Sequence, residues 1–168
     1  MHWDELVSYI KELPYGRISN REDLTLVLSE QKGSCSSKHA LLKTVAVENQ
    51  MEDVGLFIGI YKMTRENTPG IGSVLTDHKL PYMPEAHCYL KIDGEPFDAT
   101  NAVSDFYQIK KDLIEEMEIE PWQIGSFKVE YHKCFLKNWI SCNSVGIPFD
   151  QLWSIREKCI ENLSNPPL

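Results

Sequence analysis

The fold is decided by the stretch Glu85-Ala86-His87-Cys88-Tyr89-Leu90-Lys91-Ile92-Asp93-Gly94-Glu95-Pro96-Phe97-Asp98-Ala99-Thr100. Its dipeptide Asp93-Gly94 is typical of a two-residue β-turn in which both residues need a positive φ, so the flanking segments are predicted to form a hairpin. A turn of this length fixes the register: Ile92 faces Glu95, and pairing continues until His87 faces Thr100. Side chains alternate along each strand, so one face of the hairpin is apolar and suited to a core: Cys88, Leu90, Ile92, Phe97 and Ala99.

The opposite face of the hairpin carries polar groups, among them His87 and Asp98. In the expected register these two residues are diagonal neighbours, with Cβ atoms roughly 7 Å apart, within reach of a hydrogen bond from imidazole to carboxylate. A carboxylate that holds one ring nitrogen fixes the tautomer and leaves the other nitrogen free to act as a base. The alternative is a histidine beside an aspartate on a solvated sheet face, with no chemical role.

A base of this kind needs a nucleophile, and Cys35 is the best candidate. The apolar spacing predicts a helix over residues 34–48, with Ser34 as its cap and Cys35 in its first turn. Unpaired N–H groups and the helix dipole lower the pKa of a thiol there, and the thiolate is the reactive form. Cys88 points to the wrong face of the hairpin. The alternative for Cys35 is a small buried hydrophobe, which is also how we interpret Cys134, Cys142 and Cys159.

The other elements follow from hydrophobic periodicity and from Gly and Pro punctuation. Helices are expected over residues 3–13, 20–28, 104–118 and 148–163, and strands over residues 54–61 and 127–135. Residues 64–84 form a long connection rich in Pro and Gly, which we expect to border the active cleft, with Tyr82 or Met83 beside Cys35. The alternative is a surface excursion without a role. The pattern predicts one α+β domain over residues 1–168.

Composition limits the classes of function. The chain has 168 residues, of which 42% are hydrophobic and 25% charged, and its net charge is −8. These values are typical of a globular protein, and the charge argues against nucleic-acid binding because the basic residues are not clustered. We expect no membrane span and no export signal. Five cysteines without a C-x-x-C motif favour a reducing compartment, so the expected location is cytoplasmic.

Three blocks of the sequence together resemble the transglutaminase-like superfamily. They run from Gly33-Ser34-Cys35 to Leu42, from Glu85-Ala86-His87 to Tyr89, and from Gly94 through Phe97-Asp98-Ala99 to Thr100. The resemblance covers residues 33–101 and rests on the order Cys, His, Asp and on the local context of each. Three departures stand out: Ser36 where many transglutaminases have Trp, Ala99 where Pro is frequent, and a short hairpin between the His and the Asp.

The resemblance implies a papain-like α+β fold in which the Cys-bearing helix packs against an antiparallel sheet that carries His and Asp. It also implies that Cys35 is the nucleophile, His87 the base and Asp98 the residue that orients His87. The expected activity is that of a cysteine-dependent amide hydrolase or acyl transferase, acting through an acyl-enzyme on a peptide, protein or small amide. This interpretation needs no cofactor and no metal, and it leaves the oligomeric state open.

Two other classes of function stay open at this stage. A metal site could use Cys35, His39 and His87, with His78 or Asp98 added, although no pair has the spacing of a strong zinc motif. A non-catalytic module could keep the fold and use its cleft to bind a partner. The reactivity of the Cys35 thiol distinguishes a catalytic site from a binding module.

Overall fold

The structure is a computed structural model that describes residues 2–165. Its helices are α1 (Trp3–Glu12), α2 (Leu26–Ser29), α3 (Cys35–Glu48), α4 (Val74–Asp77), α5 (Tyr107–Lys110), α6 (Ser126–Asn143) and α7 (Phe149–Ser164), with short 3-10 turns η1 (Pro69–Ile71) and η2 (Pro121–Ile124). Its strands are β1 (Val54–Met63), β2 (Met83–Ile92), β3 (Glu95–Phe97) and β4 (Leu113–Ile119). The chain therefore mixes helix and sheet, as expected for the α+β class.

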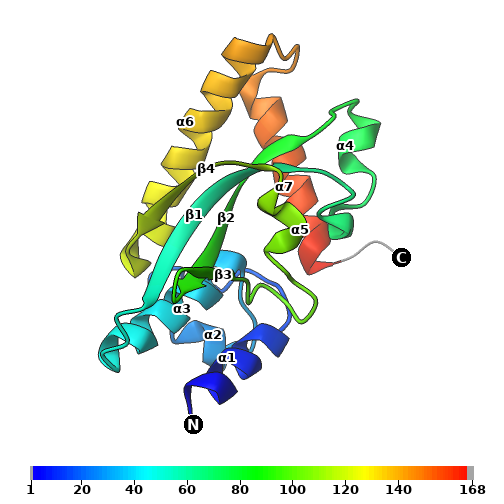
Figure 1. The fold of residues 1–168 in the computed structure, drawn as a ribbon. Coiled ribbons are helices and arrows are strands. Elements are labelled where there is room, and N and C mark those ends of the chain that lie inside the picture. Colours follow the sequence, from blue (N-terminus) through cyan, green and yellow to red (C-terminus); the bar gives the residue numbers. More distant parts are fainter. Residues whose placement is uncertain (1, 166–168) are drawn as a thin grey trace.

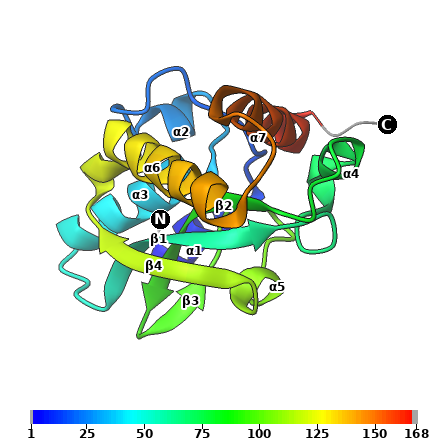
Figure 2. The same cartoon turned by 90° about the horizontal axis from the view of Figure 1, so that it is seen from above.

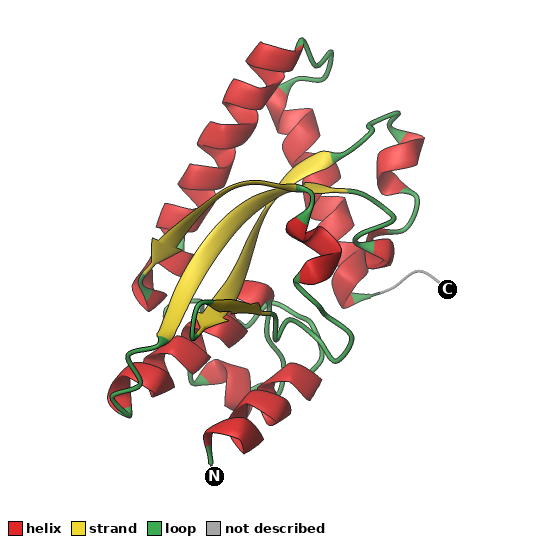
Figure 3. Ribbon diagram, in the orientation of Figure 1, coloured by secondary structure: helices red, strands yellow, loops and turns green. Residues whose placement is uncertain are grey.

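The strands form one antiparallel sheet in the order β3-β2-β1-β4. The sheet is curved, with helices gathered around it (Figure 3). The N-terminal helices α1 to α3 lie at one end of the sheet, and α6 and α7 lie toward the other (Figure 1). Seen from above, α3, α6 and α7 are on one side of the sheet and α5 is on the opposite side (Figure 2). Helix α3 packs against β1 and β2 and thereby covers the centre of the sheet.

The hairpin predicted from Asp93-Gly94 is present in the expected register. Asp93 and Gly94 have φ values of 53° and 81°, and Ile92 pairs with Glu95. The ladder is shorter than expected, because it ends at the pair Leu90 and Phe97. Residues 98–100 leave the sheet. The part of β2 that precedes Leu90, which includes His87 and Cys88, therefore has no strand beside it on the β3 side. This free edge is where the N-terminus of α3 lies.

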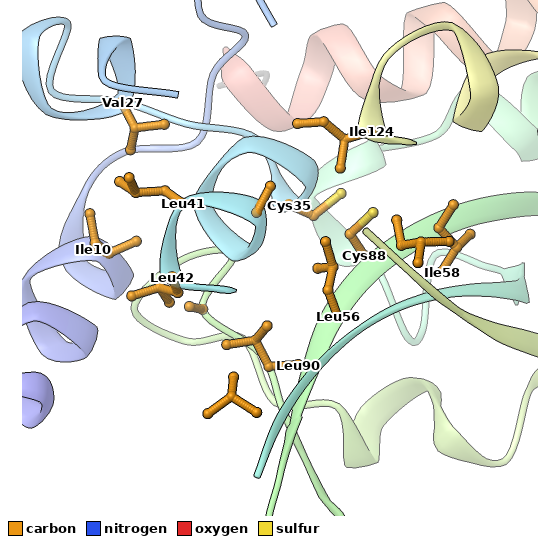
Figure 4. Packing of buried hydrophobic residues seen from close by; sticks show 14 of the residues in the cluster. Ile10, Val27, Cys35, Leu41, Leu42, Leu56, Ile58, Cys88, Leu90 and Ile124 are labelled. Atoms are coloured by element: carbon orange, nitrogen blue, oxygen red, sulfur yellow. The ribbon is translucent and has the colours of Figure 1, made fainter. Parts of the chain in front are cut away.

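The two faces of the sheet contribute to two hydrophobic clusters. Alternate residues of β1 and β2, such as Leu56, Ile58 and Leu90, pack with α1, α2 and α3 in the first cluster. Figure 4 shows this cluster, with Cys35 and Cys88 next to each other between α3 and β2. The second cluster contains Tyr89 with residues of α4, α5, α6 and α7.

A glycine of β1 permits close packing on the face that carries Tyr89. A Cβ atom at Gly59 would lie 2.7 Å from Leu113 Cδ1 and 3.1 Å from Tyr89 Cε1. The aromatic ring of Tyr89 and the side chain of β4 therefore fill the space that a side chain at position 59 would need.

The expected helix over residues 104–118 is wrong over most of its length. Only α5 is helical there, and residues 113–119 form the edge strand β4 instead. Met117 and Ile119 pack in the first hydrophobic cluster and Leu113, beyond a shift in register, packs in the second, while Glu115 and Glu118 are exposed. Acidic residues are common on the solvated flank of a helix, but charged residues on an edge strand also protect it from pairing with other chains.

The expected strand over residues 127–135 is also wrong, because these residues belong to helix α6. Their aromatic content favoured a strand. The spacing of Phe127, Tyr131, Phe135 and Trp139 is four residues, however, which places all of them on adjoining positions of one helix face. Among the remaining predictions, the helices over residues 3–13, 34–48 and 148–163 and the strand over residues 54–61 are confirmed, whereas only Leu26–Ser29 of residues 20–28 is helical.

Candidate active site

Cys35 is the first residue of α3. The Ser34 hydroxyl accepts a hydrogen bond from the Ser37 N–H at 3.4 Å, and the Ser37 hydroxyl accepts one from the Ser34 N–H at 3.0 Å. This reciprocal capping fixes where the helix begins, which is a local property of the sequence. Cys35 is 8% exposed, so its sulfur meets solvent only through a narrow opening.

The sulfur of Cys35 lies at the free edge of β2, among groups that stabilise a thiolate. Burial by itself raises the pKa of Cys35. The Lys128 ammonium, the His87 ring and the backbone of Cys88 act in the opposite direction and lower the pKa to about 6. The thiol of Cys35 is therefore mostly ionised at neutral pH, although it is almost fully buried.

His87 and Asp98 are hydrogen-bonded, with His87 Nε2 2.8 Å from Asp98 Oδ2. Because Nε2 is held by Asp98, Nδ1 is the ring nitrogen left for another partner. The pKa of His87 is raised well above its ordinary value: burial lowers it, but the Asp98 carboxylate and the Cys35 thiolate outweigh burial. The two effects together favour a thiolate and imidazolium pair, with the carboxylate of Asp98 behind the ring.

Asp98 reaches His87 by a route that differs from the predicted one. The ladder that would make them diagonal neighbours ends one residue earlier, at Phe97. After Phe97 the chain turns, and Asp98 Oδ1 accepts a hydrogen bond from the Thr100 N–H at 2.8 Å, which fixes the carboxylate. Burial raises the pKa of Asp98, but His87 and the hydrogen bond from Thr100 lower it by more than burial raises it. The carboxyl group therefore stays ionised.

His39 does not serve as a metal ligand in this arrangement, because both of its ring nitrogens are occupied. Nε2 accepts a hydrogen bond from the Ala99 N–H at 2.7 Å, so Nδ1 carries the proton and donates to the Cys35 carbonyl oxygen at 2.6 Å. Burial lowers the pKa of His39 to about 4, and the ring is neutral. Within residues 2–165, no group of three or more His, Cys, Asp or Glu side chains is arranged to hold a metal ion. The proposed Cys35 and His39 metal pair is therefore replaced by a structural role for His39.

Lys38, the neighbour of His39, also binds the segment that carries Asp98. Its Nζ donates to the Thr100 carbonyl at 2.9 Å and to the Leu13 carbonyl at 2.5 Å, and the side chain is fully buried. Burial lowers the pKa of Lys38 to about 8, while Asp98 and Glu12 act in the opposite direction. Consecutive residues of α3 thus hold the segment that carries Asp98.

Cys35 opens into a pocket of about 70 Å³. Its walls come from the loop after α1, from the start of α3, from β2 and from the C-terminal helices α6 and α7, and they comprise Tyr15, Arg17, Arg21, Ser34, Cys35, Ser36, Glu85, Lys128, Val129, His132, Trp153, Arg156, Glu157 and Ile160. The loop after α1 is held beside α3 by backbone hydrogen bonds between Pro14, Gly16 and Gly33. A space of this size accommodates only a few non-hydrogen atoms.

The expectation that residues 64–84 border the cleft is wrong. None of them lines the pocket at Cys35. Tyr82 instead packs on Trp139, whose indole N–H donates to the Tyr82 hydroxyl at 3.0 Å, and Met83 is fully buried in the second cluster. The segment packs through η1 and α4 against α7, so its role is to complete the core.

Charged residues of α6 and α7 surround the pocket, and sequence reasoning missed all of them. Lys128 of α6 has its Nζ 2.6 Å from Ser36 Oγ and 3.7 Å from Cys35 Sγ. Arg156 of α7 binds Glu85 through two nitrogens, at 2.8 Å and 2.5 Å. The four-residue spacing from Lys128 to His132 puts both on one face of a helix, a signal that has no meaning for the strand predicted over residues 127–135.

The remaining cysteines divide into two groups. Cys88 and Cys159 are buried, in keeping with a packing role, whereas Cys134 and Cys142 on α6 are exposed. The interpretation of Cys134 and Cys142 as core residues is therefore wrong, because they lie on the outer face of a helix that was not predicted. All five cysteines are free thiols.

No helix within residues 2–165 is long and apolar enough to cross a membrane. Comparison of the chain with protein-family models, with curated proteins and with solved structures finds no match in any of the three.

Proposed function

We propose that this protein is a cysteine-dependent acyl-transfer enzyme, a hydrolase or acyltransferase that uses Cys35, His87 and Asp98 as a catalytic triad. The observation that carries the proposal is the contact of His87 with Asp98 at 2.8 Å, in a site where the His87 ring and the Cys35 thiol at a helix N-terminus shift each other's pKa. Nucleophile, base and orienting carboxylate in this order are the constellation of thiol acyl transfer. The helix and sheet around them agree with a papain-like, transglutaminase-like core.

The residues support a two-step reaction. The Cys35 thiolate attacks the carbonyl carbon of an amide, ester or thioester, and the electron pair of the C=O bond moves to oxygen. When the C=O bond reforms, the bond to the leaving group breaks, and His87 donates its proton to that group. Water or an amine then attacks the thioester, with His87 as the base, and regenerates the thiolate. Asp98 keeps the ring oriented and stabilises the imidazolium throughout.

The pocket limits the acyl group that can reach Cys35. A space of about 70 Å³ favours the end of a chain, such as a carboxamide side chain or a small acyl group, over a polypeptide lying across the site. Peptide, protein and small-molecule amides all fit this description if the scissile group enters end-on. Five free cysteines are typical of a reducing compartment, so the location we propose is the cytoplasm.

The test is the formation of an acyl-enzyme with p-nitrophenyl acetate. The protein is expected to release p-nitrophenolate in a burst and to gain the mass of one acetyl group at Cys35, located by peptide mapping. The variant Cys35→Ala should show neither, and His87→Ala should lose most of the burst. Cys134→Ser is the matched control, because Cys134 is exposed and lies outside the pocket at Cys35.

One outcome tests the proposed function, and a second distinguishes a hydrolase from an acyltransferase. Acetylation that is equal in wild type and in Cys35→Ala would overturn the proposed function and favour a binding module. If the burst occurs, adding glycine ethyl ester distinguishes the two activities. An acyltransferase turns over faster with this amine and forms the N-acetyl product, whereas the turnover of a hydrolase is unaffected.

A further inference from the structure

Lys128 is a buried cation that forms no ion pair with a carboxylate in the part of the chain that the structure describes. It is 8% exposed, and its Nζ is hydrogen-bonded to the Ser36 hydroxyl at 2.6 Å and lies 3.7 Å from Cys35 Sγ. Among the described residues, no Asp or Glu oxygen lies within the 4.0 Å of an ion pair with it. Removing an ammonium group from water without a paired anion is costly, so a buried lysine of this kind calls for an explanation.

The explanation is the Cys35 thiolate. Burial lowers the pKa of Lys128, but the Cys35 thiolate and the Glu85 carboxylate act in the opposite direction, so the pKa lies above its ordinary value and the group stays charged. The dependence is mutual, since the Lys128 ammonium in turn lowers the pKa of Cys35. Lys128 and His87 are therefore two separate cations at one sulfur.

The position of Lys128 also suits the developing charge on a substrate. Cys35 and Lys128 both line the same pocket, which is where a carbonyl group must enter to reach the sulfur. The oxygen of a carbonyl attacked by Cys35 is two bonds from the sulfur, and an ammonium 3.7 Å from that sulfur is within hydrogen-bond reach of it. His87 cannot take this role, because its proton is needed by the leaving group.

We propose that Lys128 is a catalytic residue: its ammonium pairs with the resting thiolate and then donates a hydrogen bond to the substrate oxygen as that oxygen becomes an anion. The proposal rests on the proposed function of the Cys35 site. As the Sγ to carbon bond forms, the C=O electron pair moves to oxygen and is stabilised by Lys128 without proton transfer. As the C=O bond reforms, the leaving group departs with the proton of His87. The substrate oxygen is then an uncharged thioester carbonyl, and Lys128 no longer faces an anion. Ser36, one of the departures from the resembled family, holds Nζ in place.

The experiment compares two reactions of the same thiol. Alkylation by iodoacetamide needs only the thiolate, whereas acylation by p-nitrophenyl acetate also creates an oxyanion. Both rates are measured against pH for wild type, Lys128→Met and Lys128→Arg, and each is extrapolated to the fully ionised thiol. Lys133→Met is the matched control, since Lys133 is on the same helix and pairs with the exposed Glu130.

In Lys128→Met the midpoint of alkylation should move to higher pH, while the limiting alkylation rate stays within a few-fold of wild type. The limiting acylation rate should fall by about 10² to 10³, the range for the loss of one oxyanion donor. Lys128→Arg should keep the low midpoint, and Lys133→Met should match wild type in both reactions. If Lys128→Met does not fold, Lys128→Gln, which keeps a donor but no charge, is measured in its place.

An unchanged midpoint and an unchanged acylation rate in Lys128→Met would overturn the role of Lys128 while leaving the triad intact. An equal loss in both limiting rates would also overturn it, because a merely structural lysine affects the two reactions alike. Failure of wild-type Cys35 to acylate at all is a separate result, which overturns the proposed function and the oxyanion role together.

Discussion

The ring of His39 and the backbone of Ala99 are joined by a hydrogen bond of 2.7 Å, in which the Ala99 N–H donates to Nε2. Through this bond the helix that begins at Cys35 is connected to the segment that carries Asp98. The imidazole must be neutral to accept it, and burial lowers the pKa of His39 to about 4 accordingly. The distance between nucleophile and orienting carboxylate thus depends on a third side chain that does not touch substrate.

The first prediction concerns the effect of pH on stability through His39. Below about pH 6.5 the unfolded chain protonates this imidazole and the folded chain does not, so stability falls as pH falls from 6.5 toward about 4. At 1.36 kcal/mol per pH unit this effect reaches at most about 3 kcal/mol. His39→Gln lacks it, so urea unfolding should show the advantage of wild type over His39→Gln shrinking as the pH is lowered. A difference that is constant with pH would contradict a neutral buried His39.

The second prediction concerns the ionisation of Cys35. In a background of Cys134→Ser and Cys142→Ser, which removes the exposed thiols, iodoacetamide should modify Cys35 with a midpoint near pH 6. An ordinary thiol has its midpoint near pH 8.5, because fewer positive groups stabilise its anion. Peptide mapping locates the modified residue. A midpoint above pH 8 would show that His87 and Lys128 do not stabilise the thiolate.

The third prediction concerns Asp98. In Asp98→Asn the amide cannot stabilise an imidazolium, so the pKa of His87 falls and acylation of Cys35 should slow by orders of magnitude, about 10⁴-fold in a comparable triad. The fold should survive, as judged by circular dichroism, since the amide oxygen can still accept from the Thr100 N–H. Asp53→Asn, on the exposed loop before β1, serves as the control. An acylation rate within a few-fold of wild type would remove Asp98 from the mechanism.

The fourth prediction concerns the buried pair of Glu85 and Arg156, whose side chains are 7% and 11% exposed. Arg156→Met leaves the Glu85 carboxylate buried without its main partner, and breaking such a pair costs about 3 to 5 kcal/mol. Combining Arg156→Met with Glu85→Gln removes the stranded charge, so the double variant should be more stable than Arg156→Met alone. Denaturant unfolding gives the free energy of unfolding of wild type, of Arg156→Met and of the double variant. A double variant less stable than Arg156→Met would contradict this account.

Several features of the site are local and could be predicted from the sequence. Ser34 and Ser37 cap a helix within four residues, so the position of Cys35 follows from nearby residues alone. Asp93 and Gly94 likewise fix the turn, and with it the pairing from Ile92 to Leu90. Backbone preferences and short-range hydrogen bonds act over a few residues, which is why these predictions are confirmed.

The exchange of helix and strand over residues 104–135 shows where local reasoning stops. Residues 113–119 contain three glutamates and two isoleucines in a pattern that suits either a helix flank or an edge strand, and pairing with β1 decides between them. The aromatic residues of α6 have the spacing of a helix and the composition of a strand. In both cases the outcome depends on which partner surface is available, and that surface is built by distant parts of the chain.

The sequence by itself determined the cysteine at a helix start and the hairpin that presents His87. The tertiary structure alone decided what surrounds them: the turn that brings Asp98 to the ring, the clamp of Lys38 and His39, and the approach of Lys128 to the sulfur. Each of these contacts joins residues far apart in the chain or outside a regular ladder, and each depends on burial. The energy of a buried charge or hydrogen bond is set by the groups packed around it, and these are known only once the whole chain is folded.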